Sequence, residues 1–191
     1  MYVVLMAMLA LNISTEVLNG FSIVEESLNR TTSNSSKENE SIYSDFLEQM
    51  KTNPEKVKAW FDKATMVKQM SDSLYNYAQS LKEQIVKEAD GDDADLNNIV
   101  GKDNLEAAAH VMLAPGTGQG KKLYDAINSY RERILKMVND DHQRQLIAEN
   151  LSTKIPKKGN ALGKNWQEYM FESMPVAAAV TLLAKLQSDI R

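Results

Sequence analysis

Residues 53–91 read NPEKVKAWFDKATMVKQMSDSLYNYAQSLKEQIVKEADG, and this stretch decides the fold class. Asn53 is a helix-capping residue, Pro54 suits the first helical position and Glu55 is an acid in the first turn. Apolar side chains then recur at spacings of three and four residues, at Trp60, Ala64, Val67, Met70, Leu74, Tyr77, Leu81 and Ile85. Nothing interrupts this pattern before Gly91. The stretch predicts one helix of about 36 residues and about 54 Å, long enough to run the length of a bundle.

More helices are predicted on the C-terminal side. After an acidic connector, residues 104–113 form a short helical segment, and a fourth run has apolar residues on one face at Leu123, Ile127, Tyr130, Ile134 and Met137. Residues 139–141 are expected to bend or break that run, and 143–151 resume it. A Lys/Gly loop then leads to a short segment at 166–171.

The last helix is expected to start after Ser173 and Pro175. Its residues 176–184 are nearly all apolar, a run too short to cross a bilayer, so we expect a buried core helix. No alternating strand pattern and no internal repeat occur in the sequence. The predicted fold class is all-α.

On the N-terminal side, Met1 to Leu11 (MYVVLMAMLAL) carry no charge, and Glu16 is the only charged residue before Glu25. A signal peptide is disfavoured, because no Lys or Arg precedes Arg30 and no A-x-A cleavage site follows. The apolar stripe continues without a break through Ile13, Val17, Phe21, Val24 and Leu28. We therefore predict a transmembrane helix over residues 1–20, its cytoplasmic start missing, that continues into a helical bundle over residues 21–191. A buried N-terminal core helix remains the alternative.

The polar residues 31–41 (TTSNSSKENES) leave three possibilities open: a solvated part of a long helix, a break or a flexible neck. Helical spacing resumes at Tyr43, Phe46, Leu47 and Met50. The prediction for the first 52 residues is therefore less specific than for the rest.

Composition excludes several function classes. The 191 residues (21.4 kDa) carry a net charge of −4, which argues against a nucleic-acid binder. Because the chain has no cysteine, disulfides, thiolate nucleophiles and Cys-ligated metals are excluded.

Two loops resemble known ligand-binding motifs but lack essential residues. In the loop 115–122, Pro115 stands where a phosphate-binding loop needs glycine, and Lys122 where it needs Ser or Thr. Residues 93–104 lack the glycine and the terminal Glu of a calcium loop. His110 and His142 have no partner at ligand spacing. We therefore expect no enzyme activity, no metal and no cofactor.

The opening MYVVLMAMLALNISTEVLNGF resembles the membrane segment of the GldM/PorM family, the inner-membrane motor subunit of gliding motility and type IX secretion. The shared residues are Met1, Tyr2, Val4, Ala7 to Asn12, Ser14, Glu16 to Leu18 and Phe21. The later stretch NWQEYMFESMPVAAAV is similar to the family's W-x-x-x-x-F-x-x-M-P-x-x-A pattern, through Trp166, Phe171, Met174, Pro175 and Ala178. The two stretches bracket the chain, so the resemblance covers its whole length.

This resemblance implies a non-enzymatic, single-pass protein of the inner membrane with most of its mass in the periplasm. Family members are homodimers whose membrane helices sit inside a ring of GldL/PorL subunits, and the complex uses the proton motive force to drive protein secretion. Further β-rich C-terminal domains, expected to contact periplasmic and outer-membrane secretion components, are absent from this sequence. The family's basic stretch before the Met-Tyr pair is also missing.

The resemblance places the ring-facing residues on the membrane helix, at Tyr2, Met6, Ala10, Asn12 and Glu16. Small residues at Ala7, Ala10 and Ser14 would let a second membrane helix approach closely. Trp60 and Trp166 lie on helical stripes, and we expect them to be core anchors or dimer contacts.

The alternative function is a helical ligand-sensing ectodomain of a membrane receptor. Such a receptor would bind a small molecule between long helices and would need a second membrane helix. A soluble helical enzyme is disfavoured because the sequence holds no catalytic constellation.

Overall fold

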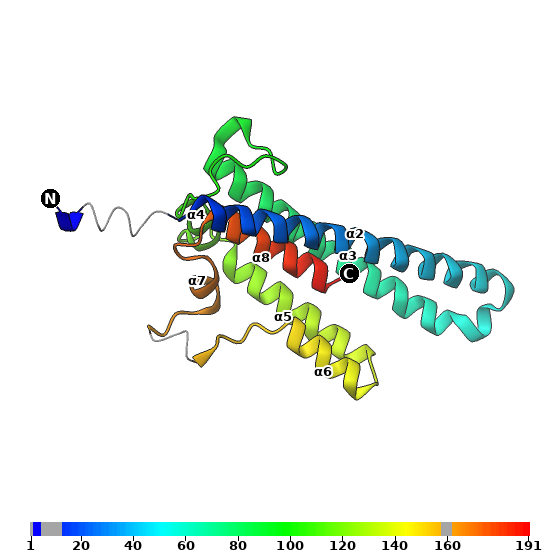
Figure 1. Cartoon of the computed structure of the whole chain (residues 1–191). Helices are drawn as coiled ribbons and strands as arrows, with labels where there is room; N and C mark the ends of the chain where they lie inside the picture. Colours follow the sequence, from blue (N-terminus) through cyan, green and yellow to red (C-terminus); the bar gives the residue numbers. More distant parts are fainter. Residues whose placement is uncertain (1, 5–12, 158–161) are drawn as a thin grey trace.

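The computed structural model describes residues 2–4, 13–157 and 162–191, which contain helices and no strand (Figure 1). The all-α prediction is confirmed. The elements are α2 (Thr15–Thr52), α3 (Pro54–Asp90), the 3-10 helix η1 (Gly91–Asp93), α4 (Ala107–Leu113), α5 (Gly120–Met137), α6 (Asp141–Asn150), α7 (Trp166–Phe171) and α8 (Val176–Asp189).

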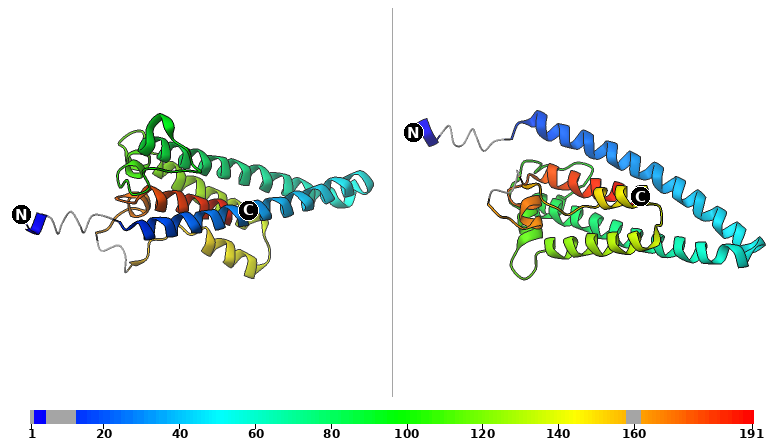
Figure 2. Two further views of the ribbon diagram at one scale, coloured as in Figure 1. Left: turned by 45° about the horizontal axis from the view of Figure 1, so that its top comes forward. Right: turned by 90° about the horizontal axis from the view of Figure 1, so that it is seen from below.

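Helices α2 and α3 form a long antiparallel hairpin joined through Asn53 alone. Pro54 opens α3 as predicted, although the Asn53 side chain makes no capping hydrogen bond. The turn of this hairpin projects beyond the other helices, as Figure 2 shows in cyan. The bundle therefore ends before the hairpin does.

The core lies between α3, α5 and α8. Helix α8 packs against both α2 and α3, and most of its residues are buried, which confirms the predicted core helix. Leu81 and Ile85 of α3 are fully buried, and Leu123 of α5 and Phe171 of α7 are each 1% exposed. The burial of apolar side chains of α8 against α2 and α3 stabilises the fold.

Trp60 is not a core residue, so the prediction of a core anchor is wrong for it, and the alternative of a dimer contact stays a prediction. Its side chain is 61% exposed, whereas Leu74 and Leu81 on the same stripe are buried as expected. Trp60 lies within the first two turns of α3, close to Asn53, and this end of the hairpin projects beyond the 14-residue α8 (Figure 2). Trp166 does pack on the core, with its ring 5.7 Å from that of Tyr124 and 6.1 Å from that of Phe171.

The polar stretch 31–41 is helical throughout, which settles the three possibilities in favour of one long helix. The hydroxyls of Thr31 and Thr32 donate to the carbonyls of Ser27 and Leu28, 3.1 and 2.8 Å away. These bonds satisfy side chains that would otherwise compete with the helix backbone.

Helix α2 begins at Thr15, because Ser14 adopts an extended conformation (φ −66°, ψ 145°) and its Oγ accepts a hydrogen bond from the Val17 amide at 3.3 Å. The expected uninterrupted helix from Met1 to Leu28 is therefore wrong at residues 13–14. Serine is among the best helix-capping residues, so the chain gains a cap by leaving the helix here. Within the described ranges, no helix is both long enough and apolar enough to span a bilayer.

Candidate functional site

The residues predicted to face a ring lie at the N-terminal end of the chain. Tyr2 is 80% exposed, and Glu16 is exposed in the first turn of α2, where the helix dipole favours an acid. Met6, Ala7, Ala10 and Asn12 lie outside the described residues. Of the small-residue set, the structure places only Ser14, which caps α2.

Helix α2 is largely exposed along its 38 residues, and its buried residues are Leu18 and Thr32. Beside the buried side of α2, Val17 is 52% and Val24 is 50% exposed. These two valines are seven residues apart and so lie on one stripe of the helix. This stripe of α2 thus presents apolar side chains that the rest of the described chain covers only in part.

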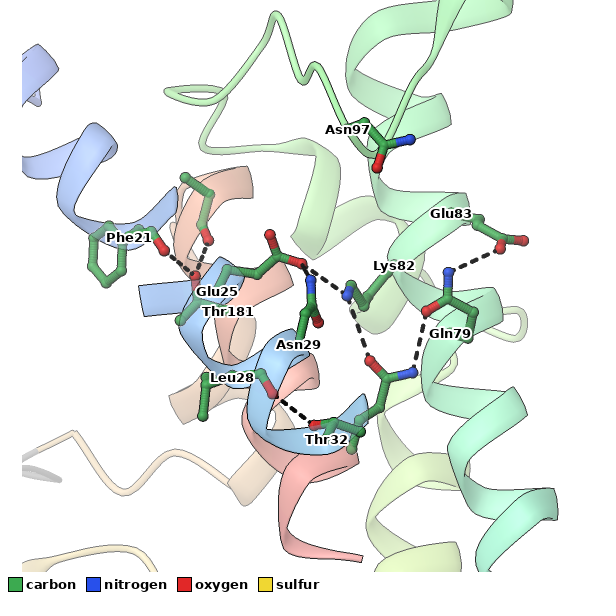
Figure 3. A network of polar contacts seen from close by, with 12 residues as sticks. Phe21, Glu25, Leu28, Asn29, Thr32, Gln79, Lys82, Glu83, Asn97 and Thr181 are labelled. Atoms are coloured by element: carbon green, nitrogen blue, oxygen red, sulfur yellow. Dashed lines mark hydrogen bonds and ion pairs between the residues drawn. The ribbon is translucent and has the colours of Figure 1, made fainter. Parts of the chain in front are cut away.

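The inner side of α2 meets the bundle at a polar cluster (Figure 3). Lys82 of α3 reaches Glu25 of α2 with its Nζ 3.0 Å from Oε1, and their side chains are 5% and 19% exposed. The same Nζ donates to Oε1 of Gln187 on α8 at 3.4 Å, and Asn29 Nδ2 donates to Glu25 Oε1 at 2.8 Å. Three helices therefore meet at one buried ammonium group. Such a group requires its partners, because an unpaired buried charge is strongly destabilising.

Helix α8 extends this network in both directions. Gln187 Nε2 donates to the Tyr75 carbonyl at 3.3 Å and to Gln79 Oε1 at 3.1 Å on α3. Thr181 Oγ1 lies 3.1 Å from the Phe21 carbonyl of α2 and 2.8 Å from the Ala177 carbonyl of its own helix. Polar contacts from α8 thus tie α2 and α3 to the same helix.

A second polar cluster lies at the end of α8. Arg191 Nη1 contacts Asp72 Oδ1 at 2.6 Å and Lys68 Nζ contacts Asp72 Oδ2 at 3.0 Å, while the guanidinium lies 4.5 Å from the Tyr75 ring centre. Burial alone would raise the pKa of Asp72, but the hydrogen bonds and positive charges of Arg191 and Lys68 outweigh it, and the pKa lies below its usual value of 3.8.

Next to this cluster, the Tyr130 hydroxyl is 2.7 Å from Ser71 Oγ. Burial raises the pKa of Tyr130, although the bond to Ser71 opposes that shift. The hydroxyl therefore stays protonated and serves as a structural bridge between α5 and α3.

A cleft of about 690 Å³ opens beside the Glu25–Lys82 pair, between α2 and α3 and the loop that contains residues 96–102. Its lining is mostly amide, hydroxyl and charged groups. In the parts of the chain that the structure describes, no group of three or more His, Cys, Asp or Glu side chains is placed to hold a metal ion. The polar contacts hold α2, α3 and α8 together, and within the described residues they do not form a recognisable catalytic arrangement.

Sequence reasoning did not single out Glu25, Lys82 or Gln187. A signal was present for two of them: Lys82 lies beside Leu81 on the buried side of α3, and Gln187 follows the apolar run of α8. A long polar side chain within a predicted buried stripe indicates a buried polar contact. Its partner on α2 could not be identified without the fold.

These features define an all-helical bundle in which buried polar contacts join α2, α3 and α8, as far as the described residues extend. A family model described as GldM N-terminal domain matches residues 16–191, and the chain belongs to the GldM/PorM family. No curated protein matches the chain. Members of this family are structural motor subunits of the membrane-associated machinery for gliding motility and type IX secretion. The family is not a known enzyme family.

Proposed function

We propose that this protein is a subunit of a proton-motive-force-driven inner-membrane motor that powers type IX secretion and gliding motility. In this proposal its membrane helices pair inside a ring of GldL/PorL subunits and pass motion to the periplasm. The observation that carries the proposal is the family match over residues 16–191. Family membership also favours this function over the ligand-sensing receptor ectodomain.

The shape of α2 supports the transmission of motion. Its 38 residues correspond to about 57 Å of continuous helix, and it starts directly after the apolar N-terminal segment. A rotation or tilt of that segment would reach α2 through Ile13 and Ser14. A helix is a suitable element for this purpose because its backbone hydrogen bonds run along its whole length.

The stripe of α2 that contains Val17 and Val24 supports a homodimer. Val17 and Val24 are half exposed in the single chain, and a second α2 against this stripe would bury both. Ala7, Ala10 and Ser14 would extend the same close approach toward the N-terminus. The dimer axis would then run beside the first half of α2.

Dimerisation can be tested by the mass of the whole chain in mild detergent. We expect a dimer, and Val17→Glu together with Val24→Glu should halve the mass because both charges would be buried in the interface. Asn19→Glu is the control, since Asn19 is exposed and turned by about 200° from Val17. A monomer for the unmodified chain would contradict the dimer.

The ring contact can be tested by co-purification of the GldL/PorL subunit from membranes. The unmodified chain should retain the ring subunit. Tyr2→Phe removes one hydroxyl and little volume, so we expect the ring subunit to remain bound while secretion falls. Loss of the ring subunit with Tyr2→Phe would instead indicate that the hydroxyl serves assembly. No retention by the unmodified chain would contradict the proposed function.

A further inference from the structure

We propose that residues 15–36 of α2, here called the strap, can open away from the bundle, and that Glu25, Lys82 and Gln187, here called the latch, hold the strap closed. The idea that the motor uses this motion rests on the proposed function, in which the N-terminal segment passes motion to the strap that follows it. The opening itself is a property of the fold and can be measured without any partner.

The two halves of α2 are attached differently. Toward the turn, the Tyr43 ring stacks on Phe61 at 5.6 Å between centres, its hydroxyl is 3.1 Å from Thr65, and the chain passes into α3 through one residue. In the strap, the buried residues are Leu18 and Thr32. The half near the turn is therefore fixed by the hairpin, and the strap depends on contacts across to α3 and α8.

Several of these contacts are directional and polar. Lys82 of α3 donates to both Glu25 of α2 and Gln187 of α8, and Thr181 donates to the Phe21 carbonyl one turn away (Figure 3). Directional bonds break over a short displacement, whereas a broad apolar contact would weaken gradually. Movement of the strap by a few ångströms would therefore release the latch as a unit.

The cleft beside the strap makes such movement possible. The strap contributes Ser22, Glu26 and Asn29 to its lining, and Gln79, Asn97 and Lys102 lie across from them. Because this lining is polar, water can solvate both sides when the strap moves. On the side of the cleft, opening exposes little additional apolar surface. The apolar surface that opening does expose lies on the other side, where Leu18 and the strap pack against α8.

The latch also explains why the closed state depends on one ion pair. With the strap closed, the Lys82 ammonium is nearly inaccessible to water, and among the described residues Glu25 is the one carboxylate that it contacts. Removing the charge of Glu25 would leave that ammonium buried without a counter-ion. Opening the strap would return it to water, so the open state becomes the favoured one.

Pulsed electron spin resonance on the full chain tests this proposal. The sequence has no cysteine, so spin labels at Ser27→Cys and Gln84→Cys report one distance between strap and α3, and labels at Asp45→Cys and Ala59→Cys report the half near the turn. The unmodified latch should give one narrow distance for each pair. Glu25→Gln should raise the population of a longer strap distance several-fold and leave the second pair unchanged.

Glu40→Gln is the matched control, because Glu40 is also on α2 and also contacts a lysine of α3, with Lys68 Nζ 3.8 Å away and both side chains exposed. It should leave both distances unchanged. An unchanged strap distance in Glu25→Gln, or an equal change in Glu40→Gln, would overturn the latch.

Hydrogen exchange covers the case in which Glu25→Gln fails to fold. In the unmodified chain, amides of the strap should exchange together and faster than those of residues 74–86 in α3, because opening precedes global unfolding. Equal exchange rates in the two segments would show that the strap does not open separately, and would overturn the proposal.

The role of opening in secretion is tested separately. Glu25→Leu with Lys82→Met replaces the ion pair by apolar contacts and should keep the strap closed. Suppose that spin labels confirm closure and that secretion continues at the normal level. Secretion then does not use the strap motion, and this part of the proposed function is contradicted. The role of the latch in holding the strap closed is unaffected by that result. If Glu25→Gln does not open the strap, the latch fails while ring co-purification still tests the motor.

Discussion

Individual charged side chains hold this bundle together at the points where α2, α3 and α8 meet. Asp72 illustrates the principle, since one carboxylate contacts Arg191 and Lys68 at 2.6 and 3.0 Å. These contacts outweigh partial burial and keep the pKa of Asp72 below its usual value. A group with a lowered folded-state pKa stabilises the protein above its unfolded-state pKa, and this contribution is lost as the pH falls through the folded-state value.

Asp72→Asn should therefore lower the Tm at pH 7, and the difference from the unmodified chain should shrink as the pH falls below about 4. Thermal unfolding followed by circular dichroism over a pH series measures this. The control is Asp62→Asn, because Asp62 pairs with Lys58 where both side chains are more than half exposed. A Tm difference that stays constant down to pH 2 would contradict the role given to the Asp72 charge.

Burial on α3 gives a second prediction at the scale of the residue. Leu81→Ala should lower the free energy of unfolding by about 2–5 kcal/mol, because Leu81 is fully buried. Trp60→Ala, at 61% exposure, should change it by no more than about 0.5 kcal/mol in the monomeric chain. Denaturant unfolding of both variants measures the difference. A larger loss for Trp60→Ala than for Leu81→Ala would mean that the tip of the hairpin is packed.

These same residues show what the sequence could and could not predict. Leu74 and Leu81 were predictable because a helical stripe of apolar residues marks a buried face. Trp60 lies on that stripe, yet it is exposed because the length of the neighbouring α8 decides where the buried face ends. Lys82 is a charged residue that is buried, and the sequence could not predict this because its burial depends on partners from two other helices.

Among the elements, helix ends follow from local residues and were largely predictable. Pro54 and Gly91 bound α3, and the break near residue 139 separates α5 from α6. Ser14 was harder to interpret, because a small residue suits both close helix packing and a helix cap. The polar stretch 31–41 was left open since weak helix formers are decided by tertiary context.

Two glycines should respond to alanine in opposite ways. A Cβ at Gly118 would lie 2.7 Å from the Met112 carbonyl oxygen and 2.8 Å from that of Ala114, so Gly118→Ala should cost about 1–3 kcal/mol of unfolding free energy. A Cβ at Gly20 inside α2 would meet nothing within 4 Å, so Gly20→Ala should stabilise the protein by about 0.5–1 kcal/mol. Calorimetry compares them, and destabilisation by Gly20→Ala would indicate a close neighbour at that face.

The short helix α7 depends on its cap. Asn165 Oδ1 accepts from the Glu168 amide and Glu168 Oε2 accepts from the Asn165 amide, both at 2.9 Å. Asn165→Ala should therefore cost about 0.5–2 kcal/mol of unfolding free energy, while Asn165→Asp keeps an acceptor and should cost less. Equal losses in the two variants, measured by urea unfolding, would mean that the cap contributes little.

At the scale of the whole molecule, the hairpin of α2 and α3 is longer than the bundle that supports it (Figure 2), and α2 is the more exposed of its two helices. The described N-terminal end of α2 is held by the latch, and its opposite end by the turn at Asn53. This arrangement suits a helix that receives motion at one end. In the proposed motor, that motion comes from the segment that precedes α2, so the side chains of this segment should matter for secretion.

Secretion by cells that carry a polyleucine replacement of Met1 to Leu11 tests this claim most directly. A passive anchor needs only length and hydrophobicity, whereas a helix that works inside a ring must present Tyr2 and the small residues Ala7 and Ala10. Val3→Leu with Leu5→Ile is the control that keeps those side chains. We predict membrane insertion with loss of secretion for polyleucine and normal secretion for the control. Normal secretion by the polyleucine chain would contradict the motor function of this segment and leave it a tether.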